Sequence, residues 1–101
     1  MLLHTVNKSP FERNTLESCL RVCEDGAGIL LIEDGVYGAL DNTAVAELIK
    51  KRMGNIKFYV LGPDVDARGL GNQTMIDGVE TVDFGGFVDL VEKHSATQSW
   101  L

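Results

Sequence analysis

A run of four apolar residues at positions 29–32 constrains the fold more than any other feature of the chain. Gly28 precedes it and the turn-forming sequence Glu-Asp-Gly at 33–35 follows it. Such a run between turn signals is typical of a strand that is buried on both faces, as in a parallel sheet. Residues 56–61 form a second, largely apolar run, which Gly62 and Pro63 end. We therefore expect a parallel sheet at the centre of the protein.

Helical segments alternate with the predicted strands. The expected strands lie at 2–6, 29–32, 56–61 and, more weakly, 79–82, and the tail at 98–101 supplies either an edge strand or a contact. The expected helices lie at about 14–23, 45–53, 64–68 and 87–94. This alternation predicts an α/β fold of three layers, with a mainly parallel sheet of four or five strands. A length of 101 residues fits a single domain spanning 1–101.

Two starts are possible for the first helix. Ser9 could be the N-cap, with Pro10 at the first helical position and Glu12 completing a capping box. Asn14, followed three residues later by Glu17, offers a second start. The residues alone leave both open.

Composition and charge exclude several classes of protein. The longest apolar run is far below the ~20 residues needed to cross a bilayer, and polar residues follow the first four positions, so no secretory signal is expected. We expect a soluble, cytoplasmic protein. The net charge of −6 argues against direct nucleic-acid binding, because phosphate contacts need a positive surface.

No familiar cofactor motif is present. The glycines at 26 and 28 precede a strand rather than a helix, the reverse of a phosphate-binding loop, so nucleotide binding is not expected. His4, Cys19, Cys23 and His94 do not have the spacing of a zinc site, and both histidines are predicted to be structural.

Paired carboxylates at the end of a predicted strand could in principle act as a general acid and base. Glu33 and Asp34 stand in this position, but the Asp-Gly dipeptide that follows is a strong turn signal. We therefore assign the pair to the turn.

The two cysteines raise the remaining question of chemistry. Cys19 and Cys23 are four residues apart, so on a helix they share a face with Cβ atoms about 5–6 Å apart. This separation is too wide for a disulfide without unwinding of the helix. Both lie on the apolar stripe, where cysteine often serves as a small core residue. A reactive role for Cys19 would require an accessible thiolate, and its helical neighbours carry no positive charge.

A set of characteristic segments extends from one end of the chain to the other: residues 3–11 (LHTVNKSPF), 30–37 (LLIEDGVY), 59–61, 64–69, 84–90 and 98–100. Together these segments resemble the TusB/DsrH family. The resemblance implies a Rossmann-like or flavodoxin-like fold. It also implies a cytoplasmic heterohexamer with DsrE-like and DsrF-like subunits that relays sulfur as cysteine persulfide to a DsrC-type carrier in bacterial sulfur oxidation. The sequence at 7–14, followed by Cys19, makes the chain look closer to DsrH than to TusB.

The family pattern assigns roles to particular residues. Its main sulfur-accepting cysteine belongs to a DsrE or TusD subunit and follows the third strand, where this chain has Gly62, Pro63 and Asp64. The DsrH cysteine falls on Cys19, which is thus the candidate persulfide carrier, whereas Cys23 is assigned to the core. No metal or organic cofactor is implied. The alternative is a non-catalytic, TusB-like scaffold subunit of a TusBCD complex, which acts with a TusE-type carrier in 2-thiolation of the tRNA wobble uridine.

Overall fold

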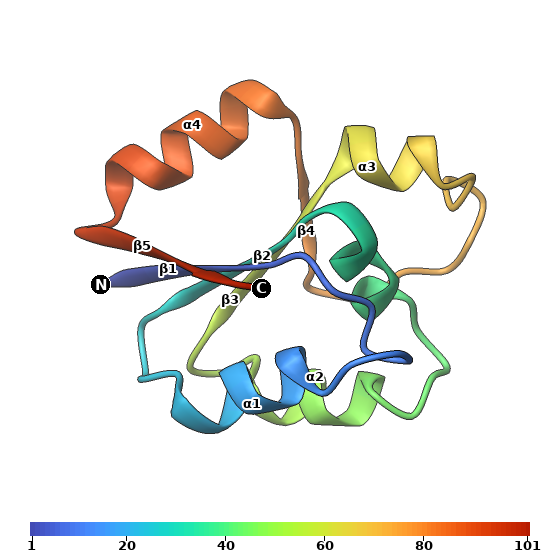
Figure 1. Ribbon diagram of the computed structural model, residues 1–101, viewed down its shortest axis with the longest axis horizontal. Coiled ribbons are helices and arrows are strands. Elements are labelled where there is room, and N and C mark those ends of the chain that lie inside the picture. The colour runs from blue at the N-terminus through green and yellow to red at the C-terminus, as the bar shows by residue number, and fades with distance from the viewer.

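All five strands run parallel in one sheet of order β4-β3-β2-β1-β5. The computed structural model describes residues 1–101. The strands are β1 (Leu2–Val6), β2 (Gly28–Leu31), β3 (Lys57–Leu61), β4 (Glu80–Val82) and β5 (Ala96–Trp100). The predicted α/β fold with a parallel sheet is confirmed, and the tail forms the fifth strand, at one edge beside β1 (Figure 1).

Helices cover both faces of the sheet (Figure 1). α1 (Thr15–Val22) and α2 (Ala46–Arg52) lie side by side on one face, and α4 (Phe84–Lys93) crosses the other. The short helix α3 (Gly62–Ala67) follows β3 directly, at the carboxyl end of that strand. No helix is both long and apolar enough to cross a membrane.

The strands place alternate residues on opposite faces, and the two faces are packed unequally. The main core contains 18 buried residues, including Ile29 and Leu31 of β2 and the buried residues of α1. Four buried residues form a separate cluster under α4, namely Leu3, Leu30, Tyr59 and Leu90. The strand residues of both groups come from β1, β2 and β3, so the helices and connecting segments that pack on the sheet make the difference.

The segment after β2 is helical rather than a simple turn. Residues Glu33–Ala39 form a 3-10 helix, η1, which the residue pattern does not predict. Gly35 lies so close to β1 that a Cβ atom there would stand 2.0 Å from the carbonyl oxygen of Val6. The glycine therefore allows η1 to pack against the carboxyl end of β1, where any larger residue would clash.

Of the two predicted starts for the first helix, the one at Asn14 is confirmed and the one at Ser9 is wrong. Ser9 instead forms a turn, in which its Oγ accepts a hydrogen bond from the Phe11 amide at 3.2 Å. Asn14 is the N-cap of α1, although its side chain makes no capping hydrogen bond. The polar residues at 9–12 thus stabilise a local turn and do not start a continuous helix.

Candidate functional site

Cys19 is completely buried between α1 and the sheet, with 0% of its surface exposed. Leu16 and Leu20 of the same helix face are buried beside it, as the helical spacing predicts. Burial at this position results from the amphipathic pattern of α1, which turns its apolar stripe toward the strands. In this chain, solvent does not reach the thiol.

Cys23 lies one helical turn further on, at the C-cap of α1, and the two sulfur atoms are 3.9 Å apart. Both cysteines are free thiols, as expected. A hydrogen bond with Cys23 and burial raise the pKa of Cys19 well above its ordinary value. The same hydrogen bond lowers the pKa of Cys23, and the positive charge of Arg52 adds to that effect. Of the two thiols, Cys19 therefore holds its proton more strongly.

These properties bear on Cys19 as the candidate persulfide carrier. A nucleophilic cysteine needs both access and ionisation. The fold of this chain supplies neither at Cys19. A sulfur-carrying role for Cys19 stays a prediction, one that would require α1 to move or open.

Arg52 fixes the end of α1 that carries the cysteines. Its guanidinium donates hydrogen bonds to the carbonyl oxygens of Leu20 and Cys23, the latter at 2.9 Å. These carbonyls lie at the end of a helix, where the backbone has no intrahelical donor left. Arg52 belongs to α2, so the contact also joins the two helices of this face.

His4 faces the same interior from β1. It is 3% exposed, and burial lowers its pKa. Its Nδ1 accepts a hydrogen bond from the indole nitrogen of Trp100 in β5 at 3.0 Å. A neutral imidazole carries one proton, so this bond places the proton on Nε2.

The structure brings together three of the four residues that the sequence did not group as a metal site. One ligand atom from each of His4, Cys19 and Cys23 lies within 4.8 Å of the other two, and all three residues are buried. His94 lies apart from them, at the end of α4, where its Nδ1 hydrogen-bonds the Leu90 carbonyl at 2.7 Å. Strand alternation carried a signal for this grouping, because it puts His4 on the face of β1 that α1 covers.

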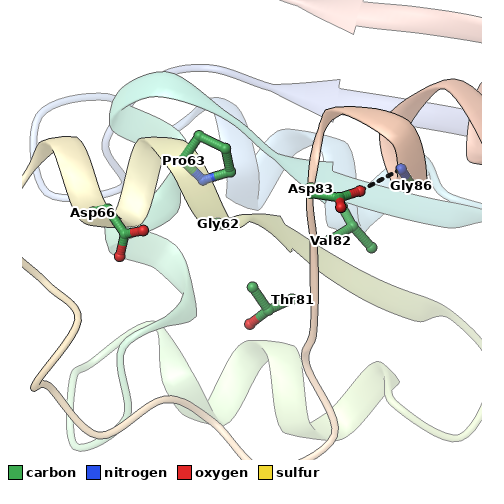
Figure 2. A pocket seen from close by; sticks show the side chains of 7 residues that line it. All are labelled: Gly62, Pro63, Asp66, Thr81, Val82, Asp83 and Gly86. Carbon is green, nitrogen blue, oxygen red and sulfur yellow. Dashed lines mark hydrogen bonds between the residues drawn. The ribbon is translucent and has the colours of Figure 1, made fainter.

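An open hollow of about 620 Å³ lies at the carboxyl ends of β3 and β4 (Figure 2). Its lining comprises Gly62, Pro63, Asp66, Thr81, Val82, Asp83 and Gly86. Asp83 caps α4 by accepting a hydrogen bond from the Gly86 amide at 2.7 Å. In parallel sheets, ligands usually bind at this edge, yet the lining offers no thiol, imidazole or amine. Gly62, Pro63 and Asp64, which stand where the resemblance implies a cysteine in a DsrE or TusD subunit, follow β3 directly.

Glu33 and Asp34 do not form an acid–base pair. The Oδ1 of Asp34 accepts a hydrogen bond from the Nε of Arg68 at 2.9 Å, and the two side chains form an ion pair. The backbone amide of Glu33 donates to the carboxylate of Asp64 at 2.7 Å. Both interactions hold η1 against α3, which is a structural role.

The chain is similar to known proteins along almost its whole length. A protein-family model described as "DsrH like protein" matches residues 8–97. The chain belongs to the DsrH-like family. Proteins named TusB from Enterobacter sp. (strain 638) and Shigella flexneri are 37% and 36% identical to it, over 98% of this chain and 100% of theirs. The expected closer likeness to DsrH than to TusB is not confirmed, because both of these full-length relatives are named TusB.

Two solved structures share the fold of this DsrH-like chain. The ychN protein of E. coli matches with a TM-score of 0.83 and 16% identity, covering 97% of each chain. A protein of unknown function from Methanobacterium thermoautotrophicum matches with a TM-score of 0.74 and 13% identity, covering 97% of this chain and 96% of its own. At these identities the likeness concerns the fold.

Proposed function

We propose that this chain is a TusB-like, non-catalytic subunit of a cytoplasmic sulfur-relay complex that serves 2-thiolation of the tRNA wobble uridine. The observation that carries the proposal is the 36–37% identity to proteins named TusB along essentially the whole chain. The burial of Cys19, the raised pKa of its thiol and the thiol-free hollow at the carboxyl ends of β3 and β4 support it. In this role the chain positions other subunits that accept the sulfur.

The partners that this proposal implies are TusC-type and TusD-type subunits, with a TusE-type carrier receiving the sulfur. A surface suited to such subunits lies on α4. Phe84, Val88 and Val91 are 62%, 56% and 41% exposed and recur at helical spacing. Large apolar side chains gathered on one exposed helix face are typical of an interaction surface. We call these three residues the α4 stripe and assign it to a partner subunit.

A second function is favoured by the family description as DsrH-like, together with the presence of Cys19. Here the chain belongs to a DsrEFH-type complex of sulfur oxidation, with DsrE-like and DsrF-like partners and a DsrC-type carrier. The Cys19 thiolate would attack the terminal sulfur of an incoming persulfide, which breaks the persulfide S–S bond and releases the donor thiolate. A carrier thiolate would then attack the outer sulfur of the Cys19 persulfide, take that sulfur and release the Cys19 thiolate, as in thiol–disulfide exchange. This function needs Cys19 to become exposed and ionised in the complex.

Mass spectrometry of the assembled complex separates the two functions. The complex is exposed to a persulfide donor, and the wild-type chain is compared with Cys19→Ser and Cys23→Ser. We expect added sulfur on a partner subunit, none on this chain, and unchanged transfer to the carrier in both variants. Sulfur on Cys19 that the carrier protein removes, together with slower transfer in Cys19→Ser alone, would overturn the scaffold proposal in favour of the relay.

A further inference from the structure

We propose that His4, Cys19 and Cys23 form a buried binding site for one soft metal ion, Zn²⁺ or Cu⁺. The proposal goes beyond the scaffold function and does not depend on it. The three side chains come from β1 and from the end of α1, are 3%, 0% and 6% exposed, and converge within 4.8 Å. Cys19 and Cys23 are the only cysteines of the chain, and His4 is one of its two histidines.

The spacing of the two sulfur atoms fits a shared metal ion. Thiolates bound to Zn²⁺ at about 2.3 Å with near-tetrahedral angles lie about 3.8 Å from each other. The Sγ atoms of Cys19 and Cys23 are 3.9 Å apart. An imidazole nitrogen on the same ion would lie about 3.6 Å from each sulfur, so a movement of His4 on the order of 1 Å completes the set.

Thiolate and imidazole ligands select the class of metal. Soft sulfur donors favour Cu⁺ and Zn²⁺ over hard cations such as Mg²⁺ and Ca²⁺. When Cys19 and Cys23 bind Zn²⁺ as thiolates, they release two protons to solvent, and the two thiolate charges balance the charge of the ion. Cu⁺ with the same two thiolates leaves one negative charge, which Arg52 offsets from its position against the Cys23 carbonyl.

A second hollow gives the ion a route and a further coordination position. This hollow, of about 470 Å³, is lined by His4 together with Met1, Glu24 and Gln98 among others. Of the three proposed ligands, His4 alone lines this hollow. Water in this space would complete a four-coordinate Zn²⁺, whereas Cu⁺ needs only the three side chains.

Trp100 makes metal binding observable. Its indole N–H occupies Nδ1 of His4, which leaves the proton on Nε2. A metal ion at Nδ1 displaces the indole, and a metal ion at Nε2 moves the imidazole proton to Nδ1, where it faces the indole N–H. Either way the Trp100–His4 hydrogen bond breaks. Trp100 is the only tryptophan of the chain, so its fluorescence reports on this contact alone.

The test uses the reduced, chelator-treated chain. It is titrated with Zn²⁺ and, under anaerobic conditions, with Cu⁺, while bound metal is measured by native mass spectrometry and Trp100 by fluorescence. We expect one equivalent of metal and a saturable change in fluorescence. Tighter binding of one ion than of the other identifies the metal, and binding of either supports the site.

Variants and a spectroscopic signature assign the ligands. Cys19→Ser, Cys23→Ser and His4→Gln should each weaken binding by at least as much as the roughly 10–100-fold loss seen on removal of outer-shell partners. His94→Gln, the matched control, should bind as wild type does. Because the core variants could fail to fold, Cd²⁺ is also added to the wild-type chain, where the ultraviolet band of cadmium–thiolate bonds should report two thiolates. No binding of Zn²⁺ or Cu⁺, a wild-type complex without that band, or binding that only His94→Gln weakens would overturn the proposal.

Discussion

The two faces of the sheet differ in how completely they are buried. On the face of α1 and α2, 18 buried residues form one continuous core that extends to the carboxyl ends of the strands. On the face of α4, the buried hydrophobic cluster comprises four residues, while the α4 stripe lies exposed beside it. Since β1, β2 and β3 serve both faces, the difference lies in the helices and in the connecting segments. We infer that the first face stabilises the chain and that the second is completed by a partner.

Matched leucine truncations should give the largest effect and the clearest contrast between the faces. Leu→Ala in a core costs about 2–5 kcal/mol, depending on the cavity that is left. Leu16→Ala in α1 should fall in the upper part of that range, because the main core surrounds it. Leu90→Ala in α4 should fall near the lower end, because few buried residues pack around it. Urea unfolding of the isolated chain measures both, and equal losses would break the comparison.

Removal of Arg52 should produce the next largest loss. Arg52→Ala leaves the carbonyls of Leu20 and Cys23 without their donors, and such an unpaired group costs about 1–3 kcal/mol. The neighbouring exposed residue provides the control, since Lys51→Ala should stay within about 0.5 kcal/mol of wild type. If the two variants unfold at the same urea concentration, Arg52 does not tie α2 to α1.

Exposed valines on the two faces should differ in assembly and not in stability. Val88→Gln in the α4 stripe should weaken binding to partner subunits by about tenfold, or ~1.4 kcal/mol. Val22→Gln on α1 is the control, because Val22 is 61% exposed but lies outside the stripe. Both should unfold within about 0.5 kcal/mol of wild type. Co-purification with TusC-type and TusD-type partners measures assembly. An equal loss of partner binding in both variants would show that the α4 stripe is not part of the interface.

Alkaline pH should produce the smallest effect, confined to the α4 face. Burial, with the nearby charge of Glu80, raises the pKa of Tyr59 above its ordinary 10.0. As pH rises through 10, Tyr59 therefore loses its proton in the unfolded chain before it does so in the folded chain. This ionisation stabilises the unfolded state, so the free energy of unfolding falls. Tyr59→Phe should remove that part of the loss, whereas Tyr37→Phe should keep it. The measurement is urea unfolding at about pH 8 and above about pH 10. If the free energy of unfolding fell equally for both variants between these pH values, the assignment to Tyr59 would be contradicted.

The sequence predicts the sheet well because its central strands are apolar on both faces. Residues 29–32 and 56–61 indicate β2 and β3 without knowledge of their neighbours. It fails where the decisive contact is distant along the chain. η1 depends on the approach of Gly35 to Val6, and the turn at Ser9 fits the same residue pattern as a helix cap.

The cysteines also show this difference between what local sequence predicts and what depends on distant contacts. Helical spacing placed Cys19 and Cys23 on one buried stripe, as the structure has them. Their convergence with His4 required the pairing of β1 with β2 and the position of α1 over it, neither of which is written in local sequence. Trp100 reaches His4 across 96 residues of chain, so only the fold reveals that contact.

Hydrogen exchange of the chain alone and in complex with its partner subunits tests the unequal faces most directly. We predict that the amides of α4 exchange faster than those of α1 in the isolated chain and gain the most protection in the complex. The amides of α1 and α2 should change little. Protection gained over α1 and α2, with α4 left as it was, would contradict the inference that a partner completes the α4 face.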